Sequence, residues 1–185
     1  VLTRDCATPN CPIGGVRVYI SGAEELGHTF TRSDGRFILV SRPGERVVVF
    51  EDDAHMQVQR SVRVERAKRA TLDDVVLTPL GARAAVLAPY PDPPDGVPLG
   101  ALDWHVAVAQ TTVDPVDGDR TPKVFFPSGT TAQVNGSPLT GEIFVRATEF
   151  TVGADGPTAM PGSLPPSSGY TYAVELTVDD PGGVP

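Results

Sequence analysis

The chain has 185 residues, among them 19 prolines and 19 glycines, and 40% of its residues are hydrophobic. This content suffices for a core, and the valine-rich, turn-rich composition favours an all-β globular protein. The net charge of −8 lies in residues 81–185, because residues 1–80 carry eleven basic and eleven acidic side chains. An acidic surface repels phosphate backbones, which excludes nucleic acid as a partner of the second half. No apolar run is long enough to predict a membrane span.

The amino-terminal region gives two expectations. The sequence begins at Val1 without a methionine or a signal peptide, so we expect a piece cut from a larger extracytoplasmic protein. Cys6 and Cys11 are the only cysteines and are spaced for a small disulfide ring, which would contribute at most about 2 kcal/mol. Two free thiols are the alternative. No histidine has ligand spacing with the pair, which argues against zinc.

Short runs of alternating apolar and polar residues fill the first half. Turn residues separate these runs, as is typical of antiparallel strands. The turn Ser33-Asp34-Gly35 is expected to close a hairpin, because glycine adopts the positive φ of a tight turn. Strands are expected at residues 16–20, 28–31, 36–40, 46–51, 57–64 and 72–77. The pattern predicts a small two-sheet sandwich over residues 1–80.

Residues 81–100 change in character and are predicted to form an extended linker. Prolines gather between Pro89 and Pro98, where they remove backbone donors and disfavour helix and central strand. A second β-sandwich is expected over residues 101–185. Its strands are expected at residues 102–110, 122–126, 130–134, 142–150 and 170–178. Because a complete sandwich of this sort has seven or more strands, the second module is predicted to be incomplete.

Acidic runs mark two expected turns. Asp114, Asp117 and Asp119 place three carboxylates in six residues, and carboxylate clusters on loops attract calcium. Acids beside glycine and proline are also ordinary turn residues, so the calcium site is the weaker of the two interpretations. Residues 51–53 form a second acidic run, interpreted as a solvated turn.

No catalytic constellation can be identified in the sequence. His28, His55 and His105 are isolated from one another, and no serine lies in a G-x-S-x-G elbow. We therefore expect no enzymatic activity, no cofactor and no small-molecule ligand. Each histidine is assigned a structural or surface role.

The sequence over residues 15–80 resembles the carboxypeptidase regulatory-like, or transthyretin-like, domain. The resemblance lies in the runs PIGGVRVYISG, ELGHTFTRSDGRFILV and LDDVVLTPL. Its best-marked element is T-x-x-D-G-x-F, here Thr31, Asp34, Gly35 and Phe37. The resemblance implies a seven-stranded sandwich without activity of its own. It further implies that the Asp-Gly turn closes a hairpin and that Phe37 plugs the core. Taken alone, this module would also be consistent with an accessory domain of a secreted peptidase.

The second half contains the phrases FPSGTT, RATEFTVG and AMPGSLPPSSGYTYAVEL, which resemble the segment after such a domain in bacterial RHS/YD-repeat proteins. The domain order is similar in teneurins, where the module and a fibronectin-like plug precede a hollow β-shell of YD repeats. The resemblance implies a non-catalytic, extracytoplasmic structural module whose partner is the YD-repeat shell of its parent polypeptide. These residues contain no YD repeat and no toxin domain, so a toxin-associated role would belong to the parent.

Two further expectations concern partners. The loop over residues 151–169 is too rich in proline, glycine and serine for regular structure, and loops of this length are usually functional. Met160, Leu164 and Pro165 are its expected partner-facing anchors. The alternative function is an extracellular carbohydrate- or protein-binding module, for which Trp104, Tyr90 and Tyr170 are the candidate aromatic contacts.

Overall fold

The computed structural model contains two compact units. The first comprises Val1–Leu80 and Phe150–Ala173, and the second Gly81–Glu149 and Val174–Pro185. The chain therefore passes from one unit to the other three times. The structure describes residues 1–4, 10–82, 84–85, 104–114, 118–127, 130–134, 136–138, 144–150, 156–162 and 173–179.

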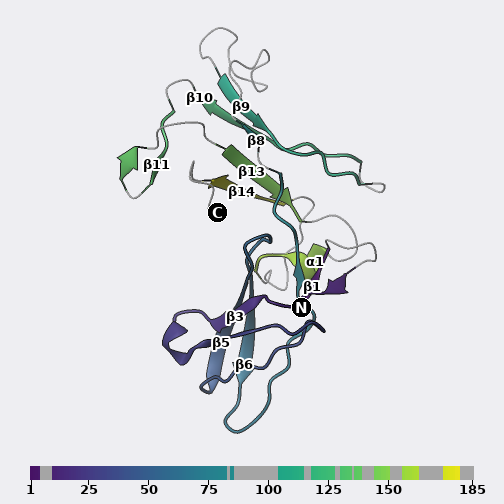
Figure 1. Cartoon of the computed structure of the whole chain (residues 1–185), viewed down its shortest axis with the longest axis vertical. Helices are drawn as coiled ribbons and strands as arrows, with labels where there is room; N and C mark the ends of the chain where they lie inside the picture. The colour runs from purple at the N-terminus through teal and green to yellow at the C-terminus, as the bar shows by residue number, and fades with distance from the viewer. Residues whose placement is uncertain are drawn as a thin grey trace. The chain divides into compact units, whose positions relative to one another are not determined.

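A four-stranded antiparallel sheet with strand order β4-β3-β5-β6 dominates the first unit (Figure 1). Its strands are β3 (Arg17–Ile20), β4 (His28–Phe30), β5 (Gly44–Glu51) and β6 (Val58–Val64). A 3-10 turn, η1 (Glu24–Leu26), connects β3 and β4. The expected alternation holds along β3, where Val18 and Ile20 are buried and their neighbours half-buried. This alternation gives the sheet one apolar face.

A second, smaller sheet completes the core of the first unit. It contains β1 (Leu2–Thr3), β2 (Cys11–Pro12) and β7 (Val76–Leu77), with β1 in the centre, antiparallel to β2 and parallel to β7. The core consists of side chains from both sheets and their flanking residues: Val16, Val18, Ile20, Val48, Phe50, Val58, Val75 and Leu77.

The second unit is also built of antiparallel strands. One sheet has the order β14-β13-β8, and hairpins β9–β10 and β11–β12 accompany it. The strands are β8 (Ala84–Ala85), β9 (Trp104–Val108), β10 (Lys123–Pro127), β11 (Gln133–Val134), β12 (Ser137–Pro138), β13 (Phe144–Glu149) and β14 (Val174–Asp179). Val106, Ala107, Val145 and Ala147 are its most buried apolar residues among those described.

The all-β prediction is confirmed, because the helical segments among the described residues are η1 and the four-residue α1 (Gly156–Ala159). The strand expected at residues 36–40 is wrong: residues 36–43 pair with no neighbour in a sheet. Ala84 and Ala85, expected in the linker, pair with β13 and belong to its sheet. Residues 86–100 lie outside the described part, and the predicted domain boundaries stay a prediction. None of the described helices is long and apolar enough to cross a membrane.

Candidate functional site

Strand β6 carries a basic residue on its apolar face. Val58, Arg60 and Val62 alternate with exposed residues, so Arg60 shares the face that two valines turn toward the core. A guanidinium on such a face needs partners, because burial without them is costly. Burial lowers the pKa of Arg60, since desolvation disfavours its charged form.

The partners of Arg60 come from a segment about 100 residues later in the chain. Its guanidinium donates hydrogen bonds to the carbonyl oxygens of Thr158 at 2.5 Å and Met160 at 2.8 Å. On the same strand, the backbone N–H of Gln59 donates to the carbonyl oxygen of Pro161 at 2.7 Å. Charged donors form the stronger class of hydrogen bonds. We call this set of contacts the Arg60 anchor, which holds residues 158–161 against β6.

Apolar packing reinforces the Arg60 anchor. Met160 is 9% exposed and forms a buried cluster with Met56 and Phe150. The carbonyl oxygen of Phe150 also accepts a hydrogen bond from the guanidinium of Arg4, at 3.2 Å. The side chain of Met160, a predicted partner-facing anchor, thus packs within the first unit, and its contact with a partner stays a prediction. Leu164 and Pro165 lie outside the described residues.

The Thr31–Phe37 motif organises the turn after β4. The buried hydroxyl of Thr31 donates to the carbonyl oxygen of Ile13 at 2.8 Å and accepts from the N–H of Val16 at 3.0 Å. The carboxylate of Asp34 accepts from the N–H two residues later at 3.0 Å. This bond is typical of Asx turns and stabilises the reversal locally.

The last two motif residues connect this turn to the rest of the unit. Gly35 has φ of 74°, and an added Cβ would collide with the carbonyl oxygen of Val1. Only glycine therefore allows the first residue to approach so closely. Phe37 packs against the core with its ring edge toward Phe50, at 5.5 Å between centroids. The sequence identified these positions by resemblance, and the contacts give each a physical role.

The His55 imidazole contacts two polar side chains. Its Nε2 lies 2.8 Å from the hydroxyl of Thr3, and its Nδ1 lies 2.5 Å from the carboxylate of Asp52. Hydroxyl, imidazole and carboxylate thus follow one another in the order that nucleophilic catalysis uses. However, Thr3 is 6% exposed and the His55 side chain 8%, so the hydroxyl faces no open site. The arrangement joins β1 to the loop after β5.

Residues 51–53, interpreted as a solvated turn, also form polar contacts within the first unit. Asp52 binds His55, and the Glu51 carboxylate forms an ion pair with Arg17 at 2.9 Å. The spacing of Asp52 and His55 is a local signal that the sequence offers. Thr3 is more than fifty residues away, and nothing in the local sequence connects it to them.

The predicted calcium cluster contains a buried ion pair. Asp114 is 5% exposed, and its carboxylate lies 2.8 Å from the guanidinium of Arg120, which also lies 3.9 Å from Glu149. Asp119 accepts from the N–H of Asp114 at 3.3 Å. Asp117 lies outside the described residues, among which no three metal-ligating side chains gather. The calcium site stays an untested expectation.

The remaining predicted residues are placed as follows. Cys11 lies in β2 and is disulfide-bonded. Cys6, the other cysteine, lies outside the described residues, as do Tyr90 and Tyr170.

The side chains of Trp104, His28 and His105, named in the sequence analysis, lie in β4 and β9. Trp104 in β9 is half-buried, with its ring edge-on to Phe125 at 6.3 Å. His28 is exposed beside Phe30, and His105 is half-buried in β9.

Comparison with known proteins gives one family. Residues 4–77 match the family model described as the teneurin TTR-like domain. No curated protein and no solved structure gives a significant match to the chain. The match covers the four-stranded sheet, strands β2 and β7 and the Thr31–Phe37 motif, and it places a TTR-like domain of the teneurin type there. This domain belongs to a family of structural modules of larger proteins.

Proposed function

We propose that this chain, with its TTR-like domain of the teneurin type, is a non-catalytic, extracytoplasmic structural module of an RHS/YD-repeat protein. In this role the first unit supports the β-shell of the parent polypeptide, and the second helps to plug it. The Arg60 anchor is the observation that carries the proposal, because it makes part of the second half a fixed component of the first unit.

A supporting module must keep its chain segments in place under load. The Arg60 anchor supplies three hydrogen bonds and a buried apolar cluster within the first unit. The chain leaves that unit after Leu80 and returns at Phe150. A simple two-domain chain joined by one linker would make no such return.

The acidic second half supports the proposed association with a partner surface. All eight net negative charges belong to residues 81–185. In the described part of β14, Leu176 and Val178 are 54% and 53% exposed on one face of the strand. Apolar side chains on an acidic surface are suited to a partner with complementary charge.

The first test is the mass of the protein from its natural source, measured under native and denaturing conditions. A native particle far above 19.5 kDa that contains this sequence supports the module. A mass of 19.5 kDa under both conditions contradicts it and favours an independent binding module. Labelling of intact cells with a membrane-impermeant reagent tests the location, since a cytoplasmic chain would stay unlabelled. A glycan array tests the carbohydrate-binding alternative.

A second test addresses the shell directly. The chain is mixed with the separately expressed YD-repeat shell of its parent, and complex formation is measured by analytical ultracentrifugation. The double variant Leu176→Lys, Val178→Lys is expected to weaken the complex. The double variant Arg63→Ala, Glu45→Ala, which removes an exposed pair 3.8 Å apart in the first unit, is the control. Equal association of both variants would remove β14 from the proposed interface.

A further inference from the structure

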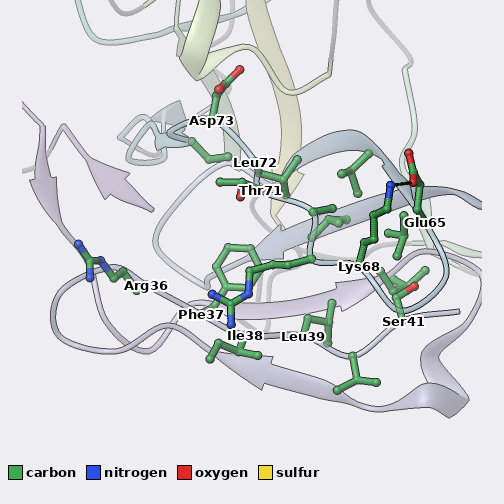
Figure 2. Close-up of a pocket in the computed structure, with 18 of the residues that line it drawn as sticks. Arg36, Phe37, Ile38, Leu39, Ser41, Glu65, Lys68, Thr71, Leu72 and Asp73 are labelled. Atoms are coloured by element: carbon green, nitrogen blue, oxygen red, sulfur yellow. Dashed lines mark ion pairs between the residues drawn. The ribbon is translucent and has the colours of Figure 1, made fainter. Parts of the chain in front are cut away.

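The first unit has an open groove of about 930 Å³ between residues 36–43 and residues 64–75. Figure 2 shows Phe37 and Leu39 on one wall and Thr71 and Leu72 on the other. Apolar side chains of the four-stranded sheet, among them Ile20, Val48 and Val62, contribute its lining. The groove lies wholly within one compact unit.

The wall of residues 36–41 resembles a strand that lacks a neighbour. Phe37 and Leu39 are half-buried against the core, whereas the alternating Ile38 and Val40 are 69% and 83% exposed. This is the period of an extended strand. Yet residues 37–41 and 69–74 make no backbone hydrogen bond to any residue that the structure describes. Unpaired N–H and C=O groups along an extended segment are a template for another strand.

Strand β1 shows where such a strand would run. The N–H of Leu2 donates to the carbonyl oxygen of Val75, which directly follows one wall, at 2.8 Å. The amino group of Val1 donates to the carbonyl oxygen of Gly35, which precedes the other wall, at 2.6 Å. Both walls thus meet at β1, and Val1 itself lines the groove.

The direction of an inserted strand follows from these contacts. A strand on the line of β1 would run parallel to residues 69–74, as β1 runs parallel to β7. It would run antiparallel to residues 36–41, which lead away from the contact between Val1 and Gly35. An occupant with this direction would satisfy the unpaired backbone groups on both sides.

The charges along the groove distinguish its two ends. Arg66, Lys68 and Arg69 lie where residues 69–74 begin, and Lys68 also pairs with Glu65 at 2.5 Å. Asp73 and Asp74 lie where that wall ends, next to β1. The amino end of an inserted strand therefore meets basic side chains, and its carboxyl end meets acidic ones.

We propose that this groove binds an extended donor strand of the larger protein, apolar at alternate positions and acidic at its amino end. The strand continues the line of β1 and completes the smaller sheet of the first unit. The source of the strand rests on the proposed function, whereas binding in the groove does not. If a peptide binds in the groove but the chain does not associate with the shell, the proposal of a strand-binding groove holds. Only the proposed function is then overturned.

The test uses the full chain and two synthetic peptides of seven residues. The first alternates valine and threonine after two amino-terminal glutamates, and the second has the same composition with the glutamates at its carboxyl end. Fluorescence anisotropy is expected to show binding of the first peptide about tenfold tighter than the second. Hydrogen exchange is expected to slow at residues 37–41 and 69–74. No binding, equal binding of both peptides or protection confined to β14 would overturn the proposal.

Two proline variants test the backbone pairing. Ala70→Pro and Thr71→Pro remove neighbouring N–H groups that make no hydrogen bond in the described structure. A strand offers alternate N–H groups to one neighbour, so one variant should lose binding about tenfold while the other retains it. Binding that both variants retain would overturn the proposal. If neither variant folds, hydrogen exchange of the unmodified chain at residues 37–41 and 69–74 tests the backbone pairing instead. Self-association of the chain without added peptide would identify a second copy as the occupant.

Discussion

Substitution of Arg60 by alanine should detach residues 158–161 from β6. The substitution removes two charge-assisted hydrogen bonds, to Thr158 and Met160. Hydrogen bonds of this kind contribute about 1.5–3 kcal/mol each when desolvated. Because Arg60 is half-buried, water replaces part of this interaction. We therefore expect the free energy of unfolding to fall by about 2–3 kcal/mol, less than the sum for two desolvated bonds.

The measurement is urea unfolding followed by far-ultraviolet circular dichroism, with the m-value checked for a change in the surface exposed. Hydrogen exchange of the Gln59 amide, which donates to Pro161, reports detachment locally. Arg63→Ala is the matched control: it lies on the same strand, and its pair with Glu45 is long and exposed. Its expected effect is about 0.5 kcal/mol or less. Equal effects of both substitutions, with unchanged Gln59 exchange, would refute the Arg60 anchor.

Three further predictions concern glycine, a buried ion pair and pH. Gly35→Ala should cost about 2–4 kcal/mol in unfolding free energy, since φ is positive and the Cβ meets backbone, against about 1 kcal/mol for Gly22→Ala, which meets no atom. Arg146→Ala should cost about 3–5 kcal/mol by urea unfolding, because Asp179, 3% exposed, loses its bidentate partner. Burial raises the pKa of Glu175 above 4.5, so the folded state binds the proton more tightly and stability falls as pH rises through that raised pKa. Glu175→Gln should therefore unfold at higher urea than wild type at pH 7, and this advantage should vanish below pH 4.

The sequence predicts the longer strands because their signal is local. Period-two alternation is sufficient for β6, whereas β5 is marked by a continuous run of valines and a phenylalanine. The two-residue strands β1 and β2 carry no such signal, and the pairing of β1 with β7 joins residues more than seventy positions apart. Residues 36–40 show the converse case. Their alternation correctly predicts which side chains face the core, but a strand also needs a neighbour, and a sequence pattern cannot supply one.

The candidate site was less accessible to sequence reasoning than the fold. Arg60 interrupts an apolar face between Val58 and Val62, and that interruption was a readable signal of a buried cation needing a partner. Its partners are carbonyl oxygens, which every residue offers, so nothing in residues 156–162 identifies them as acceptors. The surface that Met160 contacts depends on the tertiary path of the chain, which the local sequence does not show.

The Thr31–Phe37 motif and the groove are parts of one arrangement. Thr31 fixes the end of β4, and the Asp34 turn then reverses the chain. Because Gly35 has no side chain, Val1 can approach its backbone closely at the point where one wall of the groove begins. Phe37 then packs that wall against the core. The motif thus determines where β1 and residues 36–41 diverge. A side chain at position 35 would separate them, and a donor strand would then lose its alignment with β1 even where both walls kept their conformation.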